Sequence, residues 1–434
     1  MAHKRVPEGR LGRLARLAAA GARSGAGLVL SKRSDGAAES TAQILGTLRG
    51  LATKLGQMAS YVDGVIPEEH RDAYESAMKK LRAAAPTSSP QEIAELVESE
   101  LGAPIDDLFS EFTHEPFASA SIGQVHEARL LDGREVAVKV QHPGITKALE
   151  SDLANAGIVE QMMAVMGTRK LNSKAMLEVM RARFREELDY GLEAERQIAF
   201  AKLHADHPAI RIPKVIADRS TKRVLCTELV RGTSFDDACN ASEAERRAWA
   251  NTLWRFVFKG NLVGGMFNAD PHPGNYFFHE DGAVTFIDFG CVQLLEDWHR
   301  LGAVDLHLAA MKRDEALFRK RCAKFLGTKG GAFEDELVSF VRACFTPLFS
   351  SPFKISRPFV TQIVEQFKGT GVKLRKIKEE EISPVPADFF FMNRLQFGFY
   401  SVLARLDVEV DYSAVERTFL TTASIADART ADGP

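Results

Sequence analysis

Alternating apolar and polar positions in the first half of the chain predict β-strands. In residues 136–140, valines alternate with Ala137 and Lys139, so the valines share one strand face and Ala137 and Lys139 share the other. A similar stretch at 124–129 precedes it, and the Asp-Gly pair at 132–133 favours a tight turn between the two. The pattern therefore predicts a β-hairpin.

Two further apolar stretches, at 212–216 and 224–230, predict additional strands. A second hairpin is predicted after them, with strands at 276–278 and 285–287. An Asp-Gly pair at 281–282 supplies its turn. These elements together indicate a small, mainly antiparallel β region.

The rest of the chain is mostly helical in its apolar pattern. Ser89 and Glu92 form a capping box, which predicts a helix that ends at Gly102. A helical pattern resumes directly after Gly290, and residues 370–386, dense in Lys, Glu and Pro, are expected to form an exposed loop. Longer helical regions are predicted at 145–205, 243–264 and 296–420.

Composition is that of an ordinary globular protein. The chain has 434 residues, of which 45% are hydrophobic and 26% charged, and this length suffices for two lobes with additions. The formal net charge of -2 indicates no nucleic-acid partner. Five cysteines without C-x-x-C spacing favour reduced thiols, and we find neither a secretory signal nor an apolar run of about 18 residues. We therefore expect a cytoplasmic protein without a transmembrane helix.

The first 33 residues are strongly basic, with Glu8 as the only acid. Leu11, Leu14 and Leu17 recur at helical spacing beside the arginines. Such an amphipathic segment suits an anionic membrane surface, which would make the protein peripheral at the inner membrane face. A mitochondrial-type leader, in a eukaryote, and a flexible basic arm are the alternatives.

Asp270, Asn275 and Asp288 carry the most specific chemistry in the chain. Asn275 lies five positions after Asp270, and Asp288 opens an Asp-Phe-Gly triplet thirteen positions after Asn275. The second hairpin begins just after Asn275 and ends just before Asp288, so we expect these two residues to lie together. Protein-kinase-like enzymes use this layout to hold ATP·Mg²⁺: the first Asp meets the acceptor, and the Asn and second Asp bind metal.

The first hairpin carries other features of a nucleotide site. The small side chain of Ala137 lets an adenine ring approach the sheet, and Lys139 can reach the phosphates. Because Ala and Ser replace most glycines of the usual phosphate-covering loop, the corresponding loop should be stiffer here. That loop is formed by Ala118, Ser119, Ala120 and Ser121.

A hinge is predicted where the strand at 224–230 ends in Glu-Leu-Val, shortly before Gly232. Backbone groups of Glu228 and Val230 would then be available to the adenine. An ordinary edge strand is the alternative interpretation.

Four blocks of the sequence resemble those of a known family. They are the K-x-G-Q motif within 51–58, an Ala-rich loop at 116–126, an E-x-D motif at 187–189 and the catalytic loop N-A-D-P-H-P-G-N at 268–275. On these blocks the chain resembles the atypical kinases called UbiB, AarF or ADCK, which include kinase-like proteins of coenzyme Q synthesis. The first and last blocks are absent from ordinary protein kinases.

The resemblance implies roles for individual residues. Lys139 should bind the α- and β-phosphates and pair with Glu193. Asp270 is the catalytic-loop Asp, and Asn275 and Asp288 are the metal ligands. The implied cofactors are ATP or ADP with Mg²⁺, or Mn²⁺ in its place.

The family also has an N-terminal extension over the nucleotide site, to which Lys54 and Gln57 belong by resemblance. Their spacing places both on one helical turn, where they could face the carboxylates of Glu187 and Asp189. Asp189 and Glu193 are four residues apart, so we expect them on one face of a helix.

The expected fold is α+β: a bilobal protein-kinase-like fold with a small antiparallel β-lobe, a large helical lobe and a helical N-terminal extension. The predicted domains are an N-terminal arm (1–40), the K-x-G-Q cap (41–105), the N-lobe with a helical insert (106–232), the helical C-lobe (233–425) and a disordered tail (426–434).

No long activation segment and no A-P-E triplet follow Gly290, so we expect no peptide platform. The resemblance implies an atypical ATPase or kinase that supports isoprenoid-quinone biosynthesis. Its expected partners are the nucleotide, an isoprenoid-quinone precursor lipid, the membrane surface and quinone-biosynthesis enzymes. A regulatory or lipid-binding scaffold with little turnover, and a true protein kinase, are the alternatives.

Overall fold

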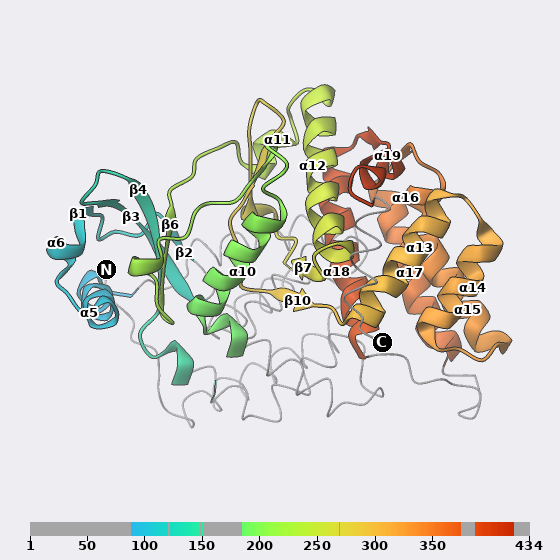
Figure 1. Ribbon diagram of the computed structural model, residues 1–434, viewed down its shortest axis with the longest axis horizontal. Coiled ribbons are helices and arrows are strands. Elements are labelled where there is room, and N and C mark those ends of the chain that lie inside the picture. The colour runs from blue at the N-terminus through green and yellow to red at the C-terminus, as the bar shows by residue number, and fades with distance from the viewer. Residues whose placement is uncertain are drawn as a thin grey trace, which may run out of the picture. The chain divides into compact units, whose positions relative to one another are not determined.

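The computed structural model describes residues 88–119, 122–147, 150, 185–268, 270–374 and 387–420 (Figure 1). The chain divides into two compact units, and it passes between them within helix α10, after Glu195, and again after Ile212 and after Val230. The basic arm, Lys54, Gln57 and the C-terminal tail lie outside the described residues, so the predictions for them remain predictions.

The first unit is built on an antiparallel sheet with strand order β1-β3-β4-β6, to which β2 adds by pairing with β3. The hairpin predicted between β3 and β4 is confirmed, since Gly133 has φ +87° and Asp132 accepts a hydrogen bond from the Arg134 amide. The described elements of this unit are α5 (Pro90–Leu101), α6 (Ile105–Leu108), β1 (Phe109–Phe112), β2 (Ala118–Ser119), β3 (Gly123–Leu130), β4 (Glu135–Gln141), the start of α10 (Tyr190–Leu203), the 3₁₀ turn η1 (Ala217–Arg219) and β6 (Val224–Glu228).

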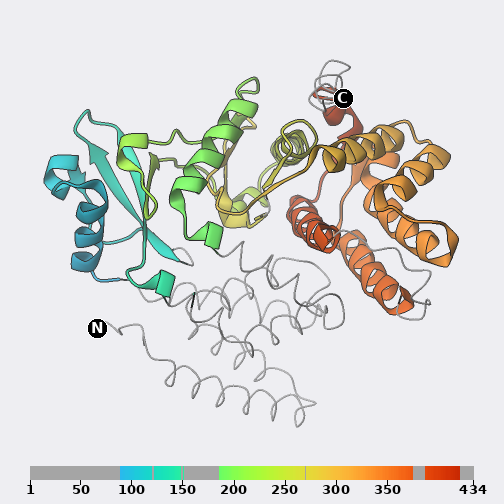
Figure 2. The ribbon, with the colours of Figure 1, turned by 60° about the horizontal axis from the view of Figure 1, so that its bottom comes forward.

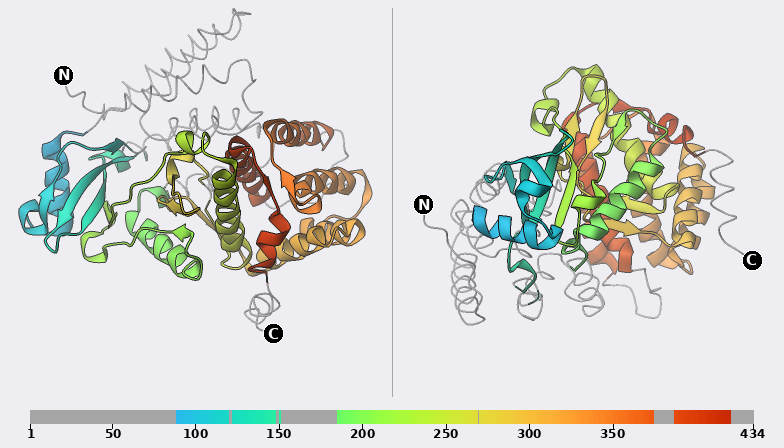
Figure 3. Two further views of the ribbon diagram at one scale, coloured as in Figure 1. Left: turned by 90° about the horizontal axis from the view of Figure 1, so that it is seen from above. Right: turned by 60° about the vertical axis from the view of Figure 1, so that its left-hand side comes forward.

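One face of this sheet packs against α5, as the valine alternation predicts. Val136, Val138 and Val140 are fully buried and share a core with Ile93 and Val97 of α5. Figure 3 shows α5, in blue, beside the strands. The capping box that begins α5 and the left-handed glycine that ends it are both present. The other face therefore carries Ala137 and Lys139.

The strand predicted at 212–216 is wrong in extent. The chain forms β5 (Ile210–Arg211), which pairs in parallel with β9 of the second unit, and Val215 makes only an isolated bridge to Thr227. Pro213 has no amide hydrogen to donate to a ladder, which explains the interruption. The strand predicted at 224–230 is confirmed but ends at Glu228, because its partner β4 begins at Glu135.

The second unit is mainly helical around an aromatic core. Figure 2 shows α13 to α17, in yellow to orange, stacked side by side, and Figure 3 shows α12 beside α18. Besides β5 and the end of α10, its described elements are α11 (Phe235–Ala238), α12 (Glu243–Leu262), β7 (Met266–Asn268), the 3₁₀ turn η2 (Pro273–Asn275), β8 (Tyr276–Phe278), β9 (Val284–Phe286), β10 (Val292–Leu294), α13 (Asp297–Met311), α14 (Glu315–Leu326), α15 (Gly331–Cys344), α16 (Thr346–Phe349), β11 (Phe353–Lys354), α17 (Arg357–Leu374), α18 (Ala387–Leu406), β12 (Glu409–Val410) and α19 (Tyr412–Arg417).

Two predictions for this unit are wrong. The chain after Gly290 forms β10 rather than a helix, because these residues pair with β7, and α13 begins only at Asp297. Residues 370–374 are not a loop, because α17 continues to Leu374 and buries Thr370. In the described part of the chain, no helix combines the length and apolar character that crossing a membrane requires.

His204 lies in the aromatic core of the second unit, stacked on Phe200 and Phe256. Its ring is 1% exposed, and neither ring nitrogen has a hydrogen-bond partner among the described residues. Burial, reinforced by the Lys259 ammonium, lowers the pKa of His204 from 6.5 to about 3. The folded protein therefore keeps this imidazole neutral in mild acid.

We expect His204 to make the protein acid-sensitive. Below pH 6.5 the unfolded chain protonates this residue and the folded chain does not, so the free energy of unfolding should decrease as the pH falls toward 3. The contribution of this residue at pH 5 is about 2 kcal/mol. Urea unfolding of His204→Phe at pH 7 and pH 5 should show a shallower pH dependence than the parent. An equal pH dependence of the free energy of unfolding in His204→Phe and in the parent would contradict the assignment.

Candidate functional site

The first unit holds a buried ion pair between Lys139 on β4 and Glu193 on α10. The Lys139 Nζ lies 2.8 and 2.9 Å from the two carboxylate oxygens of Glu193. The Glu193 side chain is 3% exposed and that of Lys139 is 18% exposed. The ammonium also lies 4.9 Å from the centroid of the Tyr190 ring. The expected pair is therefore present, with its cation on the partly open face of the sheet.

Tyr190 is a site residue that sequence reasoning missed, although it directly follows the E-x-D motif. Its hydroxyl approaches Gly123 so closely that a Cβ there would lie 2.6 Å from Tyr Oη and 2.4 Å from the Val140 carbonyl oxygen. Only glycine fits at this position, where β3 pairs with β4. The close approach of Tyr190 to the start of β3 thus requires Gly123.

The predicted placement of Asp189 on one helical face with Glu193 is wrong. Asp189 precedes α10 and caps it: its carboxylate accepts the Leu192 amide hydrogen, and its carbonyl accepts that of Glu193. The carboxylate also lies 3.7 Å from the exposed Lys222 ammonium. The Asp189 side chain is 36% exposed, whereas Glu187 is only 9% exposed. Their proposed contacts to Lys54 and Gln57 fall outside the described residues.

The small-residue loop is partly a strand. Ala118 and Ser119 form β2, in which Ala118 is opposite Val125, and Val125 is in turn opposite Lys139. Ala118 is thus separated from Lys139 by one strand of the same sheet. Ala120 and Ser121, which would form the tip, lie outside the described residues.

The two expected hinge residues, Glu228 and Val230, differ in whether their backbone amides already donate a hydrogen bond. The Glu228 amide donates to the Lys214 carbonyl at 2.9 Å, so this donor is already used. Within the described part of the chain, the Val230 amide and carbonyl make no hydrogen bond. In an extended chain, residues two apart direct their backbone groups to the same side. The Glu228 carbonyl and the Val230 amide are therefore the hinge groups suited to an adenine edge.

The second unit brings Asn275 and Asp288 together through the predicted hairpin. β8 and β9 pair in antiparallel register, and the Ile287 amide donates to the Asn275 carbonyl at 3.2 Å. Gly282 has φ +78° in the Asp-Gly turn. The prediction that this hairpin joins the two residues is confirmed.

Asn268 connects two of the candidate residues, Asp270 and Asp288, and sequence reasoning missed it. Its side-chain amide donates to the Asp288 carbonyl at 2.8 Å, and its side-chain oxygen accepts the Asp270 amide hydrogen at 3.2 Å. The Asn275 side chain donates to the Asp270 carbonyl at 3.2 Å. The signal that could have found it is its position in the sequence, because Asn268 is the first residue of the N-A-D block that contains Asp270. Nearby, His272 accepts the Gly274 amide hydrogen and so shapes the catalytic loop.

The Asp-Phe-Gly triplet is anchored at both residues that follow Asp288. Phe289 is fully buried, with its ring 5.3 Å from that of Phe200. Arg196, three residues after Glu193 on α10, donates to the Gly290 carbonyl at 3.2 Å. The Asp288 carboxylate accepts the Gly290 amide hydrogen at 2.9 Å. These contacts fix the backbone that presents the carboxylate.

The donor set of the second unit fits a hard divalent cation. Asp270 and Asp288 offer carboxylates, and the Asn275 amide nitrogen is bound to a backbone carbonyl, which leaves its side-chain oxygen for a metal. Burial, followed by the Asp270 carboxylate, raises the pKa of the neighbouring Tyr276 phenol. Tyr276 therefore stays neutral and contributes no charge of its own.

Comparison with known proteins agrees with this geometry. The family profile described as the ABC1 atypical kinase-like domain matches residues 80–322, more than half of the chain. The chain belongs to the ABC1 atypical kinase-like family. This result confirms the resemblance to UbiB, AarF and ADCK proteins.

Relatives of this ABC1 protein include the mitochondrial atypical kinase COQ8B of Rattus norvegicus, 29% identical over 86% of this chain and 70% of the rat protein. The chloroplastic protein ACTIVITY OF BC1 COMPLEX KINASE 7 of Arabidopsis thaliana is 32% identical over 60% of this chain but only 37% of the relative. A solved structure of Rv3197 in complex with erythromycin, from Mycobacterium tuberculosis, is similar with TM-score 0.60 and 28% identity over 88% of this chain and 95% of that one. The ABC1 chain thus has the kinase-like α+β fold that the sequence predicts.

Proposed function

We propose that this ABC1-family chain is an atypical kinase-like ATPase that binds ATP·Mg²⁺ and supports isoprenoid-quinone, ubiquinone-type, lipid biosynthesis. The buried Lys139–Glu193 pair carries the nucleotide part of this proposal. Kinase-like enzymes orient the phosphates with a strand lysine that a helix carboxylate holds in place, and Lys139 and Glu193 have this arrangement.

The first unit would supply the groups that bind the nucleotide. Lys139 holds the α- and β-phosphates, Glu193 orients Lys139, and Ala137 admits the adenine. The Glu228 carbonyl and the Val230 amide contact the adenine edge. Ala118 and the loop after it cover the phosphates.

The second unit would supply the metal ligands and the catalytic carboxylate. Asn275 and Asp288 bind Mg²⁺, which neutralises phosphate charge, and Asp270 orients the attacking oxygen of water or of a small acceptor. Asn268 is a positioning residue, because it holds the backbones of Asp270 and Asp288. ADP would bind the same groups after turnover.

The short connection after the Asp-Phe-Gly triplet favours hydrolysis or a small acceptor over a peptide. The chain passes from Gly290 to β10 and begins α13 at Asp297, which leaves no room for an extended activation segment. The quinone-lipid part rests on the resemblance to UbiB, AarF and ADCK proteins. A peripheral membrane contact and association with quinone-biosynthesis enzymes belong to the same proposal.

The proposal is tested by measuring nucleotide binding and phosphate release by the purified full chain, with and without Mg²⁺. Anionic vesicles, a quinone-precursor mimic and a peptide library are then added separately. We expect Mg²⁺-dependent binding, turnover that vesicles or the mimic increase, and no peptide phosphorylation. Binding with no turnover under any condition would favour a nucleotide-binding scaffold, and labelling of peptides would favour a protein kinase.

Ala120→Gly should change nucleotide preference or unmask autophosphorylation. Glycine restores the backbone freedom that alanine denies to a phosphate-covering loop. Affinities for ATP and ADP and autophosphorylation are measured beside the parent, with Ala120→Ser as a control that keeps a Cβ. If all three properties match the parent, the loop does not constrain the phosphates.

A further inference from the structure

The ring of Tyr190 lies beside the ammonium group of Lys139 in the first unit. The Lys139 Nζ atom is 4.9 Å from the centroid of the ring, within the roughly 6 Å range of a cation–π contact, and Tyr190 is 1% exposed. Tyr190 and Glu193 are three residues apart in α10, so their side chains extend from one side of this helix. The ring and the Glu193 carboxylate therefore contact the same cation.

The strand that carries Lys139 also fixes the backbone at Tyr190. The Tyr190 amide donates to the Lys222 carbonyl at 3.0 Å. Gln141, two residues after Lys139 on β4, donates its side-chain amide to the same carbonyl at 3.2 Å and to the Leu188 carbonyl at 2.8 Å. Gln141 is 1% exposed, so water does not compete for these contacts. The position of the ring is thus set by buried contacts within the first unit.

A lysine that binds phosphate benefits from such support. Its side chain is long and flexible, and holding the ammonium in one position costs conformational entropy. Contacts that hold the ammonium beforehand reduce the entropy that ligand binding must supply. Glu193 holds Lys139 by charge and hydrogen bonds, and the negative face of the Tyr190 ring adds a second attraction. A phosphate would therefore meet a cation that is already in place.

We propose that Tyr190 is a positioning residue for the phosphate groups of the nucleotide, because its ring holds the ammonium of Lys139. This role rests on the proposed function, in which Lys139 binds the α- and β-phosphates. It belongs to the face of the ring and not to the hydroxyl group. Loss of the ring should therefore weaken the binding of ADP and ATP and leave the binding of adenosine, which has no phosphate, unchanged.

The test compares ADP with adenosine by calorimetric titration of the purified full chain in the presence of Mg²⁺. Tyr190→Leu should lower the affinity for ADP about fivefold, the factor that one partly buried cation–π contact supplies. The affinity for adenosine should stay that of the parent. Tyr190→Phe keeps the ring face, so it should bind both ligands as the parent does.

Fluorinated phenylalanines at position 190 separate the charge distribution of the ring from its packing. Each added fluorine withdraws electron density from the ring face and changes the size of the ring little. The affinity for ADP should fall stepwise from phenylalanine through its mono-, di- and trifluorinated forms. A ring that only fills space would give the same affinity throughout. This series decides the question alone if Tyr190→Leu does not fold.

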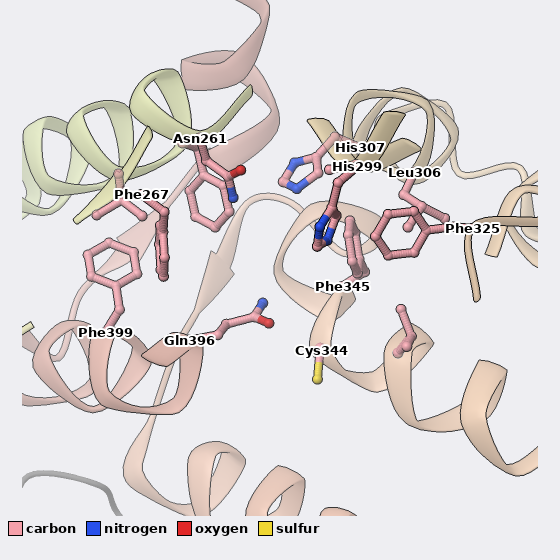
Figure 4. Close-up of a pocket in the computed structure, with 14 residues that line it drawn as sticks. Asn261, Phe267, His299, Leu306, His307, Phe325, Cys344, Phe345, Gln396 and Phe399 are labelled. Atoms are coloured by element: carbon pink, nitrogen blue, oxygen red, sulfur yellow. The ribbon is translucent and has the colours of Figure 1, made fainter. Parts of the chain in front are cut away.

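Phe399→Leu in the second unit is the control for loss of a buried ring. Phe399 is 2% exposed and lines a cavity of about 100 Å³, whose largely aromatic wall is shown in Figure 4. The described residues that line this cavity all belong to the second unit. The variant removes packing as Tyr190→Leu does, so it should lower the thermal unfolding temperature and leave the affinity for ADP unchanged.

Three results would overturn the role of Tyr190 while the proposed function stands. They are equal ADP affinity in the parent and in a folded Tyr190→Leu variant, equal losses for ADP and adenosine in that variant, and equal ADP affinity throughout the fluorinated series. A loss in Tyr190→Phe as large as in Tyr190→Leu would assign the effect to the hydroxyl group and overturn it as well. A parent that binds no ADP would instead overturn the proposed function itself, and this role with it.

Discussion

Asp288→Asn is expected to abolish Mg²⁺-dependent nucleotide binding, with a loss of affinity of roughly 100-fold or more for Mg·ATP. A carboxylate offers a full negative charge to a hard cation and a carboxamide does not. The fold should persist, because the backbone carbonyl of residue 288 still accepts the Asn268 amide and the side-chain oxygen can still accept the Gly290 amide hydrogen. Titration with a fluorescent nucleotide, with and without Mg²⁺, measures the effect.

Asp281→Asn is the matched control, since Asp281 lies in the turn of the same hairpin. Its carboxylate accepts the Ala283 amide hydrogen and contacts Arg211, and it is well exposed. Mg·ATP affinity should be unchanged in this variant. Unchanged affinity in Asp288→Asn would instead remove Asp288 as a metal ligand.

Lys139→Met should lower the free energy of unfolding by about 3 kcal/mol, because it leaves the carboxylate of Glu193 buried without the ammonium that neutralises it. The double variant Lys139→Met/Glu193→Leu should recover most of that loss, because it removes the buried charge as well. Both variants should lose nucleotide binding. Urea unfolding of Lys139→Met, Glu193→Leu, the double variant and the parent gives the coupling energy between the two residues.

Lys222→Met provides the comparison for an exposed pair. Lys222 lies 3.7 Å from Asp189 and is 71% exposed, so its removal should change the free energy of unfolding by no more than about 0.5 kcal/mol. Equal effects of Lys139→Met and Lys222→Met would contradict the assignment of a buried, coupled pair. A double variant no more stable than Lys139→Met would contradict it as well.

Hairpins and capped helices were predictable because their signals are local. The Asp-Gly pairs at 132–133 and 281–282 determine both turns, and the alternation at 136–140 determines which side chains face α5. The second hairpin also brings Asn275 to Asp288, since the register of a hairpin follows from its turn. A large part of the candidate site could therefore be predicted from contiguous residues.

Partners that are distant in the chain could not be predicted in this way. β10 was expected to be helical because its own pattern is ambiguous, and only pairing with β7 makes it a strand. Asp189 has helical spacing to Glu193, yet it caps α10, because an Asp just before a helix can satisfy its free amide groups.

The sequence by itself determined the kinase-like fold and the two hairpins, and it named Lys139, Asp270, Asn275 and Asp288 as candidate site residues. Only the tertiary structure decided that Asn268 holds the backbones of Asp270 and Asp288, that Tyr190 packs against Gly123 and Lys139, and that a cavity lies beside Asn261. The physical reason is the separation along the chain of the residues that interact. Turns, caps and strand alternation depend on neighbours along the chain, whereas burial, packing and cavities depend on which helices meet in space.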